Sequence, residues 1–120
     1  METCSTNTRY TLKQVVDFCW QHRGKHGFHN YTYEEASRAI LYAADDNGLL
    51  IVCDDHGICG VVSFEENHKG RSIFINHIFG IRDGFRTMIH ECFKRYPGYS
   101  VAGFRGPKIV TYQPRNLKYG

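Results

Sequence analysis

An apolar run leads into a helical pattern through a turn that contains a glycine. The turn reads Arg82-Asp83-Gly84-Phe85-Arg86. A strand that enters a helix this way can hold a phosphate, because the first helical amides lack partners within the helix and its dipole favours an anion. Asp83 is the expected N-cap, and its carboxylate would compete for the same amides. The turn is therefore either a phosphate site clamped by Arg82 and Arg86 or a plain helix cap.

A second group of reactive side chains follows the pattern Cys-x-x-His-x-x-Cys. Cys53, His56 and Cys59 carry it, and two thiolates with an imidazole are a common part of a zinc site. The same segment is better explained as strand, turn and strand, with both cysteines inside the strands. No fourth ligand is near in the sequence, so we expect no metal here.

A third group lies in an aperiodic stretch, HRGKHGFHN, over residues 22–30. His22, His26 and His29 could contact a substrate or, less plainly, hold a metal. Two glycines and the lack of a hydrophobic period indicate a loop. A solvated loop without a binding role is the simplest interpretation.

The composition indicates one globular domain, 1–120, with peripheral ends at 1–9 and 113–120. Of the 120 residues, 42% are apolar and 22% are charged, which argues against a disordered chain. The polar start has no secretory pattern, and no apolar run is long enough to span a bilayer. We therefore expect a cytoplasmic protein without a membrane partner, whose five scattered cysteines are mainly reduced core residues.

Charge is concentrated at one end of the chain. The formal net charge is +3, yet no acidic residue follows Glu91. A basic end suggests an anionic partner, although it can also be an ordinary solvated surface. Aromatic residues alternate with the cations, as in modules that bind single-stranded nucleic acid by stacking. The cations are Lys94, Arg95, Arg105, Lys108, Arg115 and Lys118, and the aromatic residues are Phe93, Tyr96, Tyr99, Phe104, Tyr112 and Tyr119.

Two helices are expected before these groups. Thr11 and Gln14 form one predicted capping box, and Thr32 and Glu35 form another. Apolar residues then recur at helical spacing after each box, and the second helix should stop at Asn47-Gly48. The expected inward residues are Leu12, Val15, Val16, Cys19 and Trp20 in the first helix and Ala36, Ala39, Ile40 and Ala43 in the second.

The pattern then changes to that of strands. The predicted elements are strands over 49–53, 58–64 and 71–79, a helix over 83–95, and strands over 99–104 and 109–112. Turns at 54–57, 65–70 and 105–108 join them. The order is α-α-β-β-β-α-β-β, an α/β fold with a mixed sheet. The strands that flank the last helix should be parallel, because a helix forms their crossover.

This order resembles the GNAT N-acyltransferase superfamily, with two helices, an antiparallel meander, a crossover helix and a closing strand pair. The stretch LLIVCDDHGICGVVSF is similar to the second and third strands of that family. Small phage-encoded members are also similar in length and in their basic C-terminal end. The resemblance extends over residues 9–112 and is carried by the segments 48–66, 71–81, 82–97 and 99–106.

The resemblance implies acetyl-CoA as the cofactor. In the family, it lies where the strand before the crossover helix separates from the strand after it. The pyrophosphate loop of the family, Gln/Arg-x-x-Gly-x-Gly/Ala, falls on residues 81–86. Here Ile81 and Arg86 depart from that pattern and Gly84 keeps it. The implied cofactor-binding residues are Ile75, His77, Ile78, Phe79, Arg82, Gly84, Phe85 and Arg86.

The resemblance also implies a base near the meander strands and a tyrosine acid after the crossover helix. On this sequence His77 and Glu65 are the candidate bases, and Tyr112 is the candidate acid. Histidine titrates near neutrality, which suits a base. A core or solvent-facing histidine and an ordinary strand tyrosine remain open alternatives.

The implied function is transfer of an acetyl group from acetyl-CoA to an amine of a protein or a small molecule. The degenerate loop leaves open a second function, a binding protein on the same scaffold without catalysis. Such a protein could be a phage inhibitor or a virion component, placed in the host cytoplasm or the virion. A nucleic-acid-binding module is a further alternative.

Overall fold

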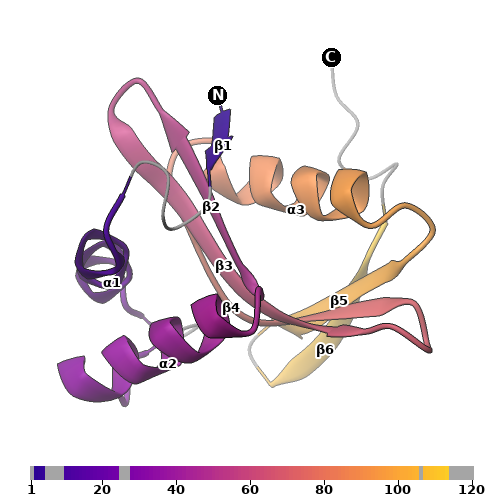
Figure 1. Ribbon diagram of the computed structural model, residues 1–120, viewed down its shortest axis with the longest axis horizontal. Helices are drawn as coiled ribbons and strands as arrows, with labels where there is room; N and C mark the ends of the chain where they lie inside the picture. Colours follow the sequence, from indigo (N-terminus) through magenta and orange to yellow (C-terminus); the bar gives the residue numbers. More distant parts are fainter. Residues whose placement is uncertain (1, 5–9, 25–27, 106, 114–120) are drawn as a thin grey trace.

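The computed structural model describes residues 2–4, 10–24, 28–105 and 107–113. It has an α+β fold, in which one mixed sheet has α1 and α2 on one face and α3 on the other (Figure 1). The elements are β1 (Glu2–Cys4), α1 (Leu12–Gln21), α2 (Tyr33–Asp45), β2 (Leu49–Asp54), β3 (Gly57–Asn67), β4 (Ser72–Gly80), α3 (Gly84–Arg95), β5 (Ser100–Arg105) and β6 (Lys108–Tyr112). The predicted order of helices and strands after Thr11 is confirmed.

Both predicted capping boxes are present. Thr11 accepts a hydrogen bond from the amide of Gln14, whose side chain accepts one from the amide of Thr11 at 2.8 Å. Thr32 and Glu35 make the same exchange at the start of α2. The boxes fix where each helix begins, so that one face of each is buried on the sheet. That face consists of Val15, Val16, Phe18, Cys19, Ala36, Ile40 and Ala43.

The sheet contains six strands in sequence order from β1 to β6. All neighbouring pairs are antiparallel except β4 and β5, which are parallel as predicted. The short β1 at the edge was not predicted, because three residues without an apolar pattern carry no strand signal. β3 also continues beyond the predicted end at 64. Glu65 and Glu66 were expected in a turn but pair with Phe74 and Ile73 of β4.

An apolar cluster lies on each face of the sheet. The cluster on the α3 face centres on Met88, Ile89 and Val101. The cluster on the other face joins α1 and α2 to β2, β3 and β4 through residues such as Val15 and Ile51. Burial of these side chains is the main source of the fold's stability. Four cysteines, Cys19, Cys53, Cys59 and Cys92, are buried and form no disulfide with one another.

β4 and β5 share only part of their length. They pair from Ser72 with Ser100 to Ile75 with Gly103. Beyond Ile75, β4 continues to Gly80 beside β3 but has no partner on its other side among the described strands. The register between β3 and β4 also shifts here, since Phe64 pairs with Ile75 and Ser63 with His77. Residue 76 is thus the extra residue of a β-bulge.

Candidate functional site

A pocket of about 400 Å³ lies where β4 and β5 part, on the face of the sheet that carries α2. The second half of α2 forms one wall, and the strands β3, β4 and β5 form the rest. The lining residues are Ala39, Tyr42, Ala43, Asp46, Ser63, Phe64, Glu65, Asn76, His77 and Phe104. Two of them, His77 and Glu65, are the bases predicted from the sequence.

The bulge at Asn76 aims His77 into this pocket. Before the bulge, Ile73 and Ile75 belong to the cluster on the α3 face. After it, His77 contacts the ring of Phe79, which belongs to the cluster on the opposite face. An extra residue in a strand reverses the alternation of side chains, and bulges re-aim side chains in this way. Without the bulge His77 would point towards α3.

Two hydroxyl groups lie within hydrogen-bonding range of the His77 ring. Ser63 Oγ is 3.2 Å from Nδ1, and Tyr31 Oη is 3.5 Å from Nε2. Burial lowers the pKa of His77 from its ordinary value, because a buried imidazole loses the hydration of its charged form. The ring is therefore neutral near pH 7, with one nitrogen able to accept a proton.

Phe28 forms the wall behind His77. It is 2% exposed and its ring centre lies 4.8 Å from that of His77 and 4.9 Å from that of Phe79. Tyr31 stacks on Phe28 with ring centres 4.9 Å apart and also contacts His77. The backbone of Phe28 has a φ of 58°, which a bulky side chain rarely adopts. The fold thus holds a strained loop residue in place against the candidate base.

Among the described residues of the loop before α2, Phe28 contacts the His77 ring, whereas His22 and His29 lie elsewhere. His22 packs on Phe18 with ring centres 4.7 Å apart, at the end of α1. His29 is exposed, and His26 lies outside the described residues. The described part of the loop therefore offers an aromatic wall and no cluster of imidazoles.

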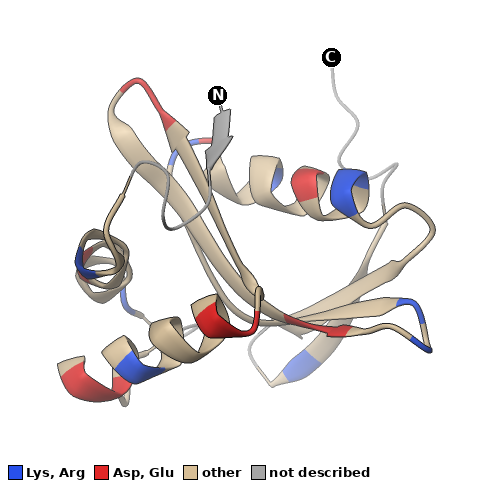
Figure 2. Cartoon of the chain, viewed as in Figure 1, with Lys and Arg blue, Asp and Glu red and all other residues tan. Residues whose placement is uncertain are grey.

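Carboxylates give the pocket a negative character. Glu65 accepts a hydrogen bond of 3.0 Å from the side-chain amide of Asn76. Asp46 follows the last turn of α2 on the other side of the pocket. Figure 2 shows acidic residues at this end of α2 and on the adjoining part of β3. No Lys or Arg is among the lining residues that the structure describes, so this lining favours a cationic group over an anion.

Tyr112 is not brought together with the two candidate bases. It pairs with Val101 of β5 and packs against the cluster on the α3 face. Its ring centre lies 6.2 Å from that of Phe85. His77 points to the opposite face, so Tyr112 lies outside this pocket. The nearer phenol is that of Tyr31.

The predicted phosphate turn is occupied by contacts within the protein. Arg82, with a φ of 53°, directs its guanidinium onto Asp54 of β2. Both oxygens of Asp54 accept a hydrogen bond, and the one from Nη2 measures 2.9 Å. This forked ion pair lowers the pKa of Asp54, chiefly through the hydrogen bond from Arg82. Arg82 is thus directed at β2 rather than at the start of α3.

The glycine of that turn also has a packing role. A Cβ at Gly84 would lie 2.0 Å from the carbonyl oxygen of Cys59, so α3 begins in direct contact with the backbone of β3. Asp83 occupies the N-cap position as predicted, but its side chain makes no cap hydrogen bond. The expectation that its carboxylate binds the first helical amides is therefore wrong. Arg86 is exposed in the first turn of α3.

The other implied cofactor residues lie along β4. Ile75 is buried on the α3 face and Phe79 is buried on the opposite face, while Ile78 is partly buried against the first of these clusters. Their side chains are core residues. Only the backbone of Ile78 and Phe79, in the stretch of β4 without a partner on the β5 side, is available for a cofactor, since Ile75 still pairs with Gly103.

The two remaining sequence patterns form no site among the described residues. Cys53 and Cys59 are buried while His56 is exposed, and no three His, Cys, Asp or Glu side chains of the described chain are grouped to hold a metal. Phe93, Tyr96, Tyr99 and Tyr112 pack against the core and form no exposed row for stacking with bases. Arg115, Lys118 and Tyr119 lie outside the described residues.

Several residues of the pocket were missed by the sequence analysis. Ser63 carried a signal, because it is a polar residue inside an otherwise apolar strand. Asn76 carried a weaker one, as a polar residue between Ile75 and His77. Tyr42, Asp46 and Phe104 gave none, since each looks like an ordinary surface residue of a helix or strand.

The chain matches no protein-family model, no curated protein and no solved structure. Among the described helices, none has the length and apolar character needed to cross a bilayer.

Proposed function

We propose that this protein is an acetyl-CoA-dependent N-acetyltransferase with a GNAT-like arrangement of its sheet. The observation that carries the proposal is the end of pairing between β4 and β5 at Ile75 and Gly103, with His77 directly beyond it. In the GNAT superfamily, which this order of elements resembles, the thioester of acetyl-CoA lies where two parallel strands separate beside the crossover helix. The amine would enter from the pocket on the α2 face.

The free side of β4 suits the pantetheine arm. Over residues 77–80 the β4 backbone pairs with β3 alone. A strand without a neighbour presents amide and carbonyl groups that an extended ligand can pair with. Pantetheine is extended and contains two amides, so it can add to β4 much as another strand would.

His77 is the proposed base. Its burial keeps the ring neutral, and the hydroxyl of Ser63 can accept a hydrogen bond from Nδ1–H, which leaves the lone pair on Nε2. The amine nitrogen attacks the thioester carbon, and the C–S bond breaks. His77 takes the amine proton and passes it to the departing thiolate, so that the imidazole returns to its neutral form. This route does not use Tyr112.

The first experiment measures binding and turnover together. Calorimetric titration with acetyl-CoA and with S-acetylpantetheine should give affinities within about tenfold of each other, because β4 and not the turn at 81–86 holds the ligand. His77→Gln should bind equally well and release CoA about 100-fold more slowly or worse in the presence of an amine. His90→Gln, on the exposed face of α3, is the matched control.

A binding protein without catalysis is the second candidate. Two contacts favour it: the ion pair of Arg82 with Asp54, and the packing of Gly84 on Cys59. The first engages the guanidinium of Arg82, and the second uses the close approach of Gly84 for packing on β3, so neither residue is reserved for a pyrophosphate. If neither thioester binds at millimolar concentration, the acetyltransferase proposal is wrong and this candidate takes its place.

A further inference from the structure

One part of the sheet has no helix over it. On the face that carries α2, no described helix covers the right-hand part of the sheet in Figure 1, where β5 and β6 lie. Phe104 and Ile109 are paired neighbours on β5 and β6, and they are 54% and 63% exposed. Phe74 of β4 continues the apolar surface, with its ring edge-on to Phe104 at 5.4 Å between centres. We call these three residues the open face.

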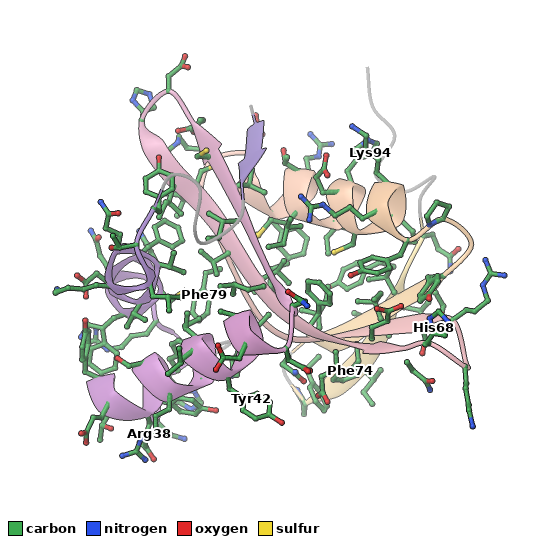
Figure 3. The ribbon with its side chains drawn as sticks, viewed as in Figure 1. Arg38, Tyr42, His68, Phe74, Phe79 and Lys94 are labelled. Carbon is green, nitrogen blue, oxygen red and sulfur yellow. The ribbon has the colours of Figure 1, made fainter. Side chains whose placement is uncertain are left out.

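The open face leads into the pocket beside His77. Phe104 belongs to both, and Tyr42, which is 75% exposed, stands on the far wall. Figure 3 shows Tyr42 and Phe74 on the same side of the sheet. Exposed apolar residues that adjoin one another, rather than lying scattered, mark an interaction surface.

The chemistry of the pocket selects one kind of side chain. Ala39 and Ala43 of α2 give the pocket an apolar lining. Asp46 and Glu65 supply carboxylates, and the aromatic rings of Tyr42 and Phe104 can contact a cation through their faces. A lysine side chain fits such a pocket. Its four-carbon stem is apolar and can lie against the alanines, and its terminal ammonium group can reach the carboxylates. The nearest cation on α2, Arg38, is directed at Glu34, with 3.9 Å between charged atoms.

We propose that the open face binds an extended segment of another protein and that the pocket receives a lysine of that segment. In this complex, the apolar residues of the segment on either side of the lysine pack against Phe74, Phe104 and Ile109. A small polyamine would fill the pocket but leave this apolar surface exposed. A second copy of the chain, related by a two-fold axis, would bring the carboxylates of both pockets towards one another, which is unfavourable.

This inference concerns binding and goes beyond the proposed acetyl transfer. The test uses no thioester. A failure of peptide binding can therefore be distinguished from a failure of the acetyltransferase proposal. The probe is a fluorescent peptide of about ten residues with one central lysine among leucine, valine and threonine. The comparison peptide has norleucine, which keeps the stem and lacks the ammonium group.

The lysine peptide should bind at least about tenfold more tightly than the norleucine peptide, as a paired ammonium group in a partly desolvated pocket predicts. Glu65→Gln and Asp46→Asn should each reduce this preference about fivefold or more. Asp45→Asn removes the same charge one residue away, outside the pocket lining, and should have no effect. Phe104→Ala should weaken both peptides, whereas Leu41→Ala, an exposed apolar residue outside the lining, should weaken neither.

Three results would overturn the inference. Equal binding of the lysine and norleucine peptides would show that the pocket does not recognise an ammonium group. Spermidine that binds as tightly as the lysine peptide would show a small-molecule site, with no contribution from the open face. Sedimentation that reveals a dimer, dissociated by Phe104→Asp, would assign the face to a second copy.

Discussion

Ser63 and His77 face each other on adjacent strands, with Ser63 Oγ 3.2 Å from His77 Nδ1. Ser63 is 5% exposed, so its hydroxyl needs a partner inside the protein. The bulge at Asn76 makes the pairing possible, because it turns His77 to the face on which the pocket lies. A hydroxyl that accepts a hydrogen bond from Nδ1–H directs the basic nitrogen of the ring towards Tyr31.

His77 should make the stability of the protein depend on pH. Burial lowers its pKa below the ordinary value of 6.5, so the unfolded state binds more protons than the folded state between the two values. The free energy of unfolding should therefore rise with pH in that window and level off above about pH 6.5. Urea unfolding between about pH 5 and pH 7.5 measures this rise. It should shrink in His77→Gln and persist in His90→Gln; an identical rise in both variants would contradict the assignment.

At Phe28, replacement by glycine should cost less stability than replacement by alanine, which is the reverse of the usual order. Phe28→Ala removes a buried ring and should destabilise the protein by about 3–5 kcal/mol. Phe28→Gly removes the same ring but relieves the backbone at a φ of 58°. The glycine variant should therefore be the more stable of the two, by roughly 0.5–1 kcal/mol after the entropy of the unfolded chain is included. Chemical denaturation decides the order, and a more stable alanine variant would show that the loop adopts another backbone conformation.

Gly84 should resist replacement for a steric reason. Its added Cβ would lie 2.0 Å from the carbonyl oxygen of Cys59, so α3 would have to move away from β3. Gly84→Ala should destabilise the protein by about 1–3 kcal/mol, although alanine favours a helix by about 1 kcal/mol. Gly24, with nothing within 4 Å of its Cβ position, gives the control, and Gly24→Ala should change the stability by less than about 0.5 kcal/mol.

The ion pair of Asp54 with Arg82 should contribute to stability only above acidic pH. The hydrogen bond from Arg82 holds the pKa of Asp54 below its ordinary 3.8. The contribution is therefore complete above that value and is lost as the pH falls through the lower, folded-state pKa. Asp54→Asn should be less stable than the natural chain at about pH 6, with the difference shrinking below about pH 4. A difference that stays constant with pH would mean that the carboxylate charge is not involved.

Local signals in the sequence predicted most of the fold. The capping boxes at Thr11 and Thr32 located two helices, because a cap depends on residues within one turn. Alternation and turn residues located the strands after Gly48. The strand β1 and the end of β3 at Asn67 were missed, since both are defined by pairing with distant strands rather than by their own composition.

The site was only partly predictable for the same reason. His77 and Glu65 were identified and do line the pocket, yet their meeting depends on the bulge at Asn76, which no local pattern announced. The ion pair of Arg82 with Asp54 was not foreseen, because Asp54 is 28 residues away in the sequence. Phe28 was not singled out, because the three histidines of its loop drew the prediction. Its contacts with the rings of His77 and Phe79 join residues that are distant in the sequence, so no local pattern predicts them.

The short pairing between β4 and β5 divides the sheet into two parts. β2 to β4 form a continuous antiparallel meander after α2, whereas the β5–β6 hairpin is joined to it by four residue pairs and by α3. Val101 of the hairpin is also buried in the cluster that contains Met88 of α3, so the core holds the two parts together. The pocket is built across this division, because His77 belongs to the meander and Phe104 to the hairpin. A substitution that shifts the hairpin against the meander would therefore change the shape of the pocket as well as the stability of the fold.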